Sequence, residues 1–173
     1  MRPRQLFADP EPLIRRVYAY VAYRIGDGPD AQDITSETFA RALRYQDSFD
    51  SARGDETAWL IGIARRVLAS GYQTATLELD EGSLGTEEHE DSTVRRLAVG
   101  DAVRRLDPKD RELIALRYGA DLKAREIAAL LDLKTNAVEV ALHRAVARLR
   151  ADVEGEPKSA SSKVVRPLAQ PSE

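Results

Sequence analysis

The stretch from Leu122 to Arg150 constrains this chain most, because it has the pattern of two helices joined by a tight turn. Apolar residues of the first segment recur at i, i+3, i+4 and i+7, which predicts one buried stripe: Ala124, Ile127, Ala128 and Leu131. Asp132-Leu133-Lys134 supplies the turn, and Thr135 or Asn136 can cap the next helix. That helix has its own apolar stripe, formed by Val138, Leu142, Ala145 and Leu149.

The opposite face of the second helix mixes polar, apolar and basic side chains. Projected at about 100° per residue, it carries Asn136, Val140, His143, Arg144 and Ala147. Two helices with buried stripes and such an outer face are typical of a DNA-binding helix-turn-helix. An ordinary helical hairpin has the same pattern, so this stretch alone leaves both interpretations open.

Composition excludes several classes of protein. The chain has 173 residues, enough for one medium domain or two small ones. No apolar run approaches the ~20 residues of a membrane span, and the N-terminal segment lacks the apolar core of a signal peptide. We therefore expect a cytoplasmic protein with no membrane insertion. The absence of cysteine excludes a disulfide framework, a thiolate metal site and a cysteine nucleophile.

The net charge of -3 conceals an uneven distribution. Residues 74–93 contain seven acidic residues and no lysine or arginine, whereas residues 94–152 contain thirteen basic and nine acidic residues. Nucleic-acid binding depends on local potential, so the near-neutral total does not argue against it. The acidic stretch breaks the helical pattern and is interpreted as a flexible linker between two helical domains.

Three amphipathic helices are predicted before the linker. The first ends at the Gly26–Pro29 turn, the second begins at a capping Asp30 and runs to about Gln46, and the third spans about Glu56–Tyr72. Their predicted buried residues are, in order, Leu13, Ile14, Val17, Tyr18, Val21 and Ile25; Ile34, Thr38, Phe39, Ala42 and Leu43; and Leu60, Ile63, Ala64 and Val67.

No strand pattern is present, so the fold class is all-α. We expect two small helical domains joined by the acidic linker, the second of them a helix-turn-helix. The expected boundaries are 1–73, 74–93 for the linker, 94–152, and 153–173 for a disordered tail. After the linker, a helix near Val94–Leu106 and another from Asp107-Pro108 to about Tyr118 precede the helix-turn-helix.

Two polar faces of the first domain each have two interpretations. The second helix lines up Asp33, Glu37, Arg41 and Arg44, which form either a binding face or a solvated face with an i,i+4 ion pair. The only tryptophan, Trp59, shares a flank with Arg66, Ser70 and Gln73. That flank is either ordinary packing at the edge of the core or a surface on which nucleobases stack.

Catalysis and metal binding find no support in the sequence. The acidic cluster around His89 lacks the ligand spacing of a calcium or zinc site. Neither His89 nor His143 has a nucleophile and an orienting acid at recognisable spacing. We expect no enzyme activity, no metal, no cofactor and no small-molecule substrate.

Three passages, in this order, resemble bacterial RNA polymerase sigma factors of the extracytoplasmic-function type in the sigma-70 family. They are DAQDITSETFARALR (30–44), TAWLIGIARRVLASGY (57–72), and LDPKDRELIALRYGADLKAREIAALLDL (106–133) followed by ALHRAVARLR (141–150). In that family the first passage docks on RNA polymerase, the second separates the DNA strands, and the third reads the promoter. The likeness covers roughly residues 6–73 and 97–150.

The resemblance implies a sigma factor that binds core RNA polymerase and directs promoter-specific transcription initiation, with three groups of site residues. Core polymerase would be bound by Asp33, Ser36, Glu37, Phe39 and Arg41. The melted minus-ten DNA would be bound by Phe49, Arg53, Trp59, Arg66, Ser70 and Gln73. The double-stranded minus-thirty-five element would be bound by Lys134, Thr135, Asn136, Glu139, Val140, His143, Arg144 and Arg148. The acidic linker would thread the polymerase's RNA exit path, although a merely solvated linker fits its composition too.

Several positions depart from the family's usual residues. Ser36 stands where glutamine is usual, Arg66 where asparagine is common, and Ser70 and Gln73 where aspartate and arginine are usual. In the promoter-reading helix, Asn136-Ala137 and Glu139-Val140-Ala141 replace Gly-Thr and basic-Ser-Arg. These positions lie outside the predicted buried stripes, so they affect which bases are read more than the fold. The alternative function is a stand-alone helix-turn-helix regulator that does not need the polymerase, and the sequence does not decide whether an anti-sigma protein binds.

Overall fold

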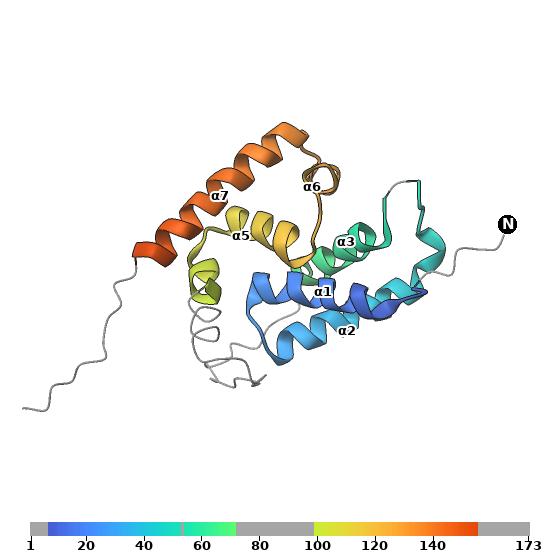
Figure 1. Cartoon of the computed structure of the whole chain (residues 1–173). Coiled ribbons are helices and arrows are strands. Elements are labelled where there is room, and N and C mark those ends of the chain that lie inside the picture. The colour runs from blue at the N-terminus through green and yellow to red at the C-terminus, as the bar shows by residue number, and fades with distance from the viewer. Residues whose placement is uncertain (1–6, 53, 72–98, 156–173) are drawn as a thin grey trace, which may run out of the picture.

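The computed structural model describes residues 7–52, 54–71 and 99–155, and the regular structure in these ranges is entirely helical (Figure 1). The elements are α1 (Pro10–Ile25), α2 (Pro29–Arg44), the short 3-10 helix η1 (Gln46–Ser48), α3 (Glu56–Ala69), α5 (Pro108–Ile114), the π-helix η2 (Ala115–Gly119), α6 (Ala124–Leu131) and α7 (Thr135–Gly155). Residues 99–105 are also helical. The predicted all-α class is confirmed, whereas the predicted linker and residues 156–173 of the predicted tail lie outside the described residues.

Several helices begin where capping residues or proline in the sequence favour a helix start. The Asp55 side chain caps α3 by accepting a hydrogen bond from the backbone N–H of Ala58 (2.7 Å), and Asp107 caps α5. The prediction that Asp30 caps α2 is wrong: Gly28 holds the cap position and Pro29 begins the helix. Proline suits the first helical position because its fixed φ is already helical and no N–H is needed there.

Three other boundaries differ from the prediction. Thr135 is the first residue of α7 rather than its cap. Helix α3 ends at Ala69, before the left-handed Gly71 (φ 63°), and not at Tyr72. Helix α7 continues to Gly155, beyond the expected boundary at residue 152, because no glycine or proline interrupts it earlier. Within the described ranges, no helix has the length and apolarity that a bilayer crossing requires.

The predicted stripes of α1–α3 form the core of the N-terminal half, with Val17, Ile34 and Leu60 almost fully buried. Two parts of the prediction are wrong. Ile14, Ile25 and Leu43 are 44%, 37% and 56% exposed, whereas Tyr20 and Ile61, which were not predicted to be buried, have no exposed surface. Helices α1 and α3 therefore bury more of their surface than the packing of α1, α2 and α3 on one another would bury.

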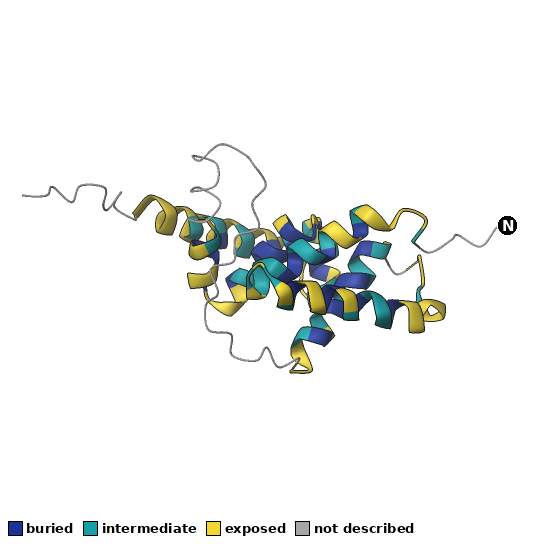
Figure 2. Cartoon of the chain, turned by 90° about the horizontal axis from the view of Figure 1, so that it is seen from below, coloured by how far each residue is buried: buried dark blue, intermediate teal, exposed yellow. Residues whose placement is uncertain are grey.

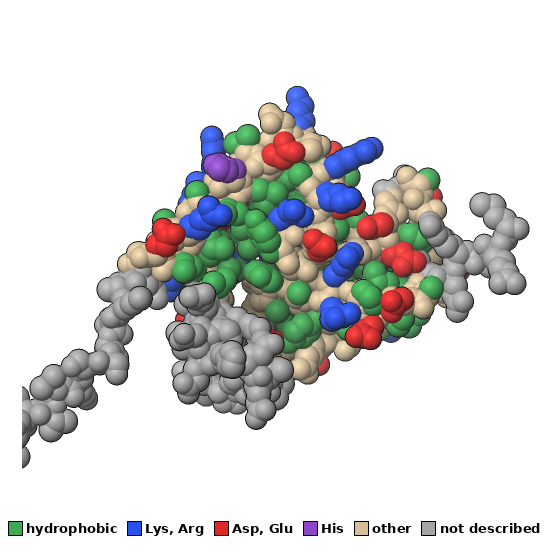
Figure 3. Space-filling model, in the orientation of Figure 1, with side chains coloured by type: hydrophobic (Ala, Val, Ile, Leu, Met, Phe, Trp, Pro, Cys, Tyr) green, Lys and Arg blue, Asp and Glu red, His purple; other side chains and the backbone are tan. Residues whose placement is uncertain are grey.

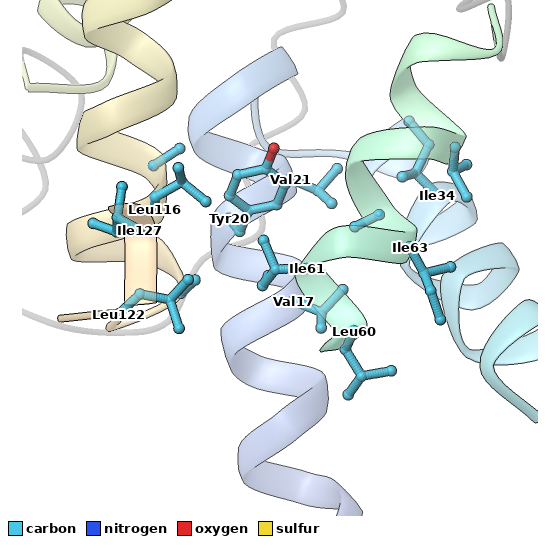
Figure 4. Close-up of a cluster of buried hydrophobic side chains, with 14 of the residues drawn as sticks. Val17, Tyr20, Val21, Ile34, Leu60, Ile61, Ile63, Leu116, Leu122 and Ile127 are labelled. Carbon is cyan, nitrogen blue, oxygen red and sulfur yellow. The ribbon is translucent and has the colours of Figure 1, made fainter. Parts of the chain in front are cut away.

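The extra burial arises because the C-terminal helices pack on α1 and α3. Leu116, Leu122 and Ile127 belong to the same hydrophobic cluster as Tyr20 and Ile61 (Figure 4). Seen from below, the buried segments lie towards the middle of the molecule and the exposed ones towards its outside (Figure 2). The two predicted domains thus share one continuous core, a placement that the sequence analysis could not give.

Gly119, at the end of η2, lies close to the backbone of α1. A Cβ at this position would lie 2.8 Å from both the Cα and the N of Tyr20. No side chain fits there without moving α1, so the position requires glycine for steric reasons.

Glu112 of α5 is the polar centre of the same contact, and its side chain is only 13% exposed. It accepts hydrogen bonds from the Tyr20 hydroxyl (3.1 Å to Oε1) and from Arg65 Nε (2.9 Å to Oε1), and it pairs with Arg24. Burial raises the pKa of Tyr20 to about 12, so the phenol keeps its proton and acts as a donor.

Arg148 links helix α7 to the start of α5 through ion pairs. Its guanidinium pairs with Asp110, whose side chain is 9% exposed, and lies 3.8 Å from Asp107. Backbone N–H groups of Asp110 and Lys109, together with Arg148, hold the pKa of the Asp107 carboxyl below its ordinary value of 3.8. This carboxylate therefore stabilises the folded state at neutral pH, and the stabilisation is lost as the pH falls through the lowered pKa.

We predict that Arg148→Ala lowers the Tm at neutral pH, because it leaves the buried Asp110 carboxylate without its cation. The difference from the wild type should shrink as the pH falls through the lowered pKa of Asp107, because the carboxyl then loses the charge that Arg148 pairs with. Thermal melts followed by circular dichroism at pH 7 and pH 3 test this. Arg144→Ala removes the same charge from an exposed position of α7 and should leave the Tm nearly unchanged. An Arg148→Ala difference that is the same at both pH values would contradict the assignment.

Candidate nucleic-acid and polymerase-binding surfaces

The C-terminal helix pair has the predicted helix-turn-helix geometry. Asp132 ends α6 in the left-handed conformation (φ 55°), and the backbone N–H of Leu133 donates to the Ala128 carbonyl (2.9 Å). On α7, Val138 and Ala145 are buried, and the other two residues of the predicted stripe are partly buried. The turn and the buried stripe together fix which face of α7 points outward.

That outer face is accessible along its length. Seven of the eight residues predicted to contact the minus-thirty-five element are exposed, and their side chains form no hydrogen bond or ion pair within the described part of the chain: Lys134, Thr135, Asn136, Glu139, Val140, His143 and Arg144. The space-filling view shows basic side chains spaced along α7 (Figure 3). Such a face can place hydrogen-bonding and apolar groups against base edges while its cations meet phosphates.

Arg148 departs from that prediction. Although its side chain is 58% exposed, its guanidinium is engaged by Asp110 and Asp107 within the same domain. We therefore revise its role from a phosphate contact to a contact that sets how α7 lies on α5. The periodicity of α7 could not reveal this, because the partners lie on another helix.

A shallow groove of about 240 Å³ between η2 and α7 was missed by the sequence analysis. Its lining combines apolar and basic side chains: Arg117, Tyr118, Leu142, His143, Val146, Ala147 and Arg150. The guanidinium of Arg117 lies 6.0 Å from the ring centroid of Tyr118 and donates to the Leu122 carbonyl (3.1 Å). The signal that could have found it is the spacing of His143 and Arg150, which at i and i+7 share one side of the helix.

The predicted polymerase-binding face of α2 is only partly free. Asp33 and Ser36 are exposed, whereas Glu37 and Arg41 are half-buried and pair with each other (Arg41 Nε to Glu37 Oε1, 2.6 Å). Arg41 therefore offsets the charge of Glu37, and Asp33 contributes most of the accessible negative charge. Phe39 is half-buried, with its ring centroid 6.0 Å from that of Phe7, so its main contact is internal.

Trp59 lies in an aromatic cluster at one end of the N-terminal half. Its ring stacks on Phe7 (centroids 6.5 Å apart) and meets the edge of Phe49 (5.4 Å). Phe49 and Trp59, both predicted minus-ten contacts, are thus brought together. Because Trp59 is half-buried, a nucleobase can reach only its remaining free surface.

The other predicted minus-ten residues fall into two groups. Arg66 and Ser70 are exposed, and the Ser70 hydroxyl donates to the Val67 carbonyl (2.9 Å). Arg66 follows Trp59 by two helical turns and so lies on the same side of α3. Arg53 and Gln73 lie outside the described residues. Where the chain is described, no group of acidic, histidine or cysteine side chains could hold a metal ion.

The sequence matches known families along most of the chain. Residues 11–76 match the profile described as Sigma-70 region 2, and residues 96–149 match Sigma-70, region 4. The chain is 35% identical over 143 residues to the ECF RNA polymerase sigma factor BldN of Streptomyces coelicolor; the alignment covers 77% of this chain and 54% of that protein. It is 31% identical over 135 residues to the RNA polymerase sigma-E factor of Streptomyces antibioticus, covering 75% of this chain and 74% of the relative.

Among solved structures, the chain is similar to CnrH in complex with the cytosolic domain of CnrY. The TM-score is 0.60 at 25% identity, and the superposition covers 84% of this chain and 82% of CnrH. The chain spans about half the length of BldN and about three quarters of the sigma-E relative. By these matches to both regions and to the named relatives, the chain belongs to the sigma-70 family, in its extracytoplasmic-function group.

Proposed function

We propose that this protein binds core RNA polymerase and directs it to a specific set of promoters. The observation that carries the proposal is the exposed outer face of α7 on a helix-turn-helix, joined in one chain to a region 2 unit. The similarity to the two Streptomyces proteins, which are RNA polymerase sigma factors, supports the same function. The stand-alone regulator is not favoured, because a regulator that acts without polymerase has no use for region 2.

In this proposal the outer face of α7 reads the minus-thirty-five element in the major groove. Asn136 can pair with adenine through two hydrogen bonds, and Val140 can pack on a thymine methyl group. Lys134 at the start of the helix contacts phosphate, which positions α7 but carries no sequence information. Glu139 would be repelled by phosphates, so we assign it to a cytosine amino group.

Residues of the N-terminal half take the other roles. Asp33 and Ser36 dock on a basic part of the polymerase, where acidic side chains steer association and select the partner. Phe49, Trp59 and Arg66 hold unstacked bases of the minus-ten element, because stacking and cationic contacts stabilise the opened strand without any reaction at the protein.

The solved structure of CnrH is a complex with the cytosolic domain of CnrY. We extend to this chain the proposal that a protein partner controls it.

One experiment tests the function as a whole. The purified chain is mixed with core polymerase, and transcription start sites are mapped on genomic DNA with and without it. We expect new start sites that share two sequence boxes at a fixed spacing. Copurification without new start sites, or new binding sites without polymerase, would contradict the proposal.

We predict that Asp33→Arg weakens association with core polymerase at low salt, because it reverses an exposed negative charge on α2. Fluorescence anisotropy of the labelled chain titrated with core polymerase measures the affinity. Asp152→Arg, the same change at an exposed position of α7, is the matched control and should bind normally. Equal affinities for the two variants would remove α2 from the docking surface.

For DNA opening, Trp59→Ala should lose about 1–3 kcal/mol of single-strand contact and shrink the promoter bubble. Permanganate footprinting measures the bubble, and a thermal melt checks that the aromatic cluster survives. Trp59→Phe keeps an aromatic ring against Phe7 and Phe49 and should retain most of the opening. A full bubble with Trp59→Ala would assign the tryptophan to packing alone.

For promoter reading, Asn136→Ala should relax the preference at one position of the minus-thirty-five box, at a cost of about 1–3 kcal/mol. Lys134→Ala should instead weaken all sequences alike and flatten the salt dependence. Both variants are measured on a library of single-base promoter variants at two salt concentrations. A uniform loss with Asn136→Ala would show that this residue does not read a base.

A further inference from the structure

We propose that Phe7 is a further determinant of minus-ten binding and that it acts by competition. In the protein without DNA, its ring covers part of the Trp59 surface on which a base of the opened strand stacks. A base takes that part of the tryptophan only when Phe7 moves away. This inference rests on the proposed function for its meaning at a promoter, whereas the competition itself can be measured without polymerase.

The ring of Phe7 contacts two other rings. Its centroid is 6.5 Å from that of Trp59, with the two planes 28° apart, and 6.0 Å from that of Phe39 on α2. The stacked arrangement matters, because an aromatic side chain binds a nucleobase through the face of its ring. Phe7 therefore presents to Trp59 the same kind of surface that a base would present.

Phe49 contacts the same tryptophan in a different way. Its plane is inclined by 61° to that of Trp59, in an edge contact with the centroids 5.4 Å apart. Phe7 and Trp59 both pack against the buried core, whereas Phe49 directly follows η1 and packs against neither core cluster of the described residues. Phe49 is thus free to close on a base that stacks on Trp59. The two phenylalanines therefore have opposite effects: Phe49 favours base binding and Phe7 opposes it.

The backbone of Phe7 is in the left-handed region, with φ at 66°. For a bulky side chain this conformation is an outlier, because Cβ crowds the neighbouring carbonyl oxygen. Such strain persists only where other contacts compensate for it. At Phe7 the compensating contacts are those of the ring with Phe39 and Trp59. A base that replaces Phe7 on Trp59 therefore also releases the strain.

The entry into α1 lets Phe7 leave without unfolding the helix. Phe7 lies three residues before Pro10, the first residue of α1, and the intervening Ala8 and Asp9 are exposed. Asp9 occupies the cap position, but its side chain forms no hydrogen bond to the helix. Rotation of the backbone at Ala8 and Asp9 is therefore sufficient to move the ring of Phe7 off Trp59.

The competition distinguishes opened DNA from duplex DNA. Stacking a base on an aromatic side chain stabilises more than a typical pair of aromatic side chains does, and the strain at Phe7 weakens that pair further. Bases in a duplex are already stacked on one another and must first be extruded at a cost. An opened strand can therefore displace Phe7, whereas a duplex has no free base face to exchange for it. The contact restricts Trp59 to strands that have already separated.

The only tryptophan of the chain reports base stacking directly, because a base that stacks on Trp59 changes its fluorescence. A short single-stranded oligothymidine is titrated into the wild type, Phe7→Ala and Phe49→Ala without polymerase. We expect Phe7→Ala to bind about threefold more tightly than the wild type, as loss of a competing aromatic pair implies, and Phe49→Ala to bind more weakly. General loosening of the cluster would shift both variants in the same direction. That outcome, or equal affinity of Phe7→Ala and the wild type, overturns the proposal.

Phe7→Asn keeps the test decisive if Phe7→Ala fails to fold. Asparagine adopts the left-handed conformation more readily than alanine, so this variant removes the ring at less backbone strain. Ala8→Asn places the same side chain at the neighbouring exposed position and is the matched control, expected to bind like the wild type. Thermal melts verify the fold of each variant. Tighter binding by Phe7→Asn supports the competition, and wild-type affinity in folded Phe7→Asn, or no binding by any protein, overturns it, whatever the mapping of start sites shows.

Discussion

The arrangement of this molecule depends on one carboxylate, that of Glu112, which is held by three donors from the other half of the chain. A buried ion pair contributes little net stability, because the desolvation of both charges offsets their attraction. Its effect is on specificity. If the C-terminal helices were rotated or shifted along α1, the carboxylate or Arg65 would be left without partners. Apolar burial around it supplies the favourable free energy, and the carboxylate selects one orientation from those that bury similar area.

The shared core also explains which parts of the fold the sequence could predict. The helix-turn-helix was predictable because its stripe is set by local periodicity and its turn by Asp132, a residue type that tolerates the left-handed conformation. Tyr20 and Ile61 were missed, since each lies beside the main stripe and is buried only by helices distant in sequence. A single helical face can be read from spacing, whereas a second buried face depends on a contact that spacing does not encode.

The residues of the candidate sites divide in the same way, into those that spacing predicts and those that depend on tertiary contacts. The outward direction of Asn136, Val140 and His143 follows from the opposite face of α7 being buried, so the sequence predicted it correctly. Arg148 looked like a member of that basic face, but its partners sit at the start of α5. For Trp59 both interpretations, core packing and base stacking, apply in part. The ring is partly covered by Phe7 and Phe49 and partly accessible. Charge and aromaticity identify candidates, and only tertiary contacts decide how much of each side chain remains for a ligand.

The π-helix η2 sets the rotational position of everything that follows it. A π-turn uses one more residue than a turn of α-helix, and such bulges are frequent at functional sites. Here the wider turn determines where Gly119 lies relative to α1. Removing one residue from Ala115–Gly119 would restore regular winding and turn everything that follows by about 100° around the helix axis. A chain one residue shorter here would have to rebuild the packing of α7 on α5 as well as the approach of Gly119 to Tyr20, so the length of this segment is constrained by contacts on both sides of it.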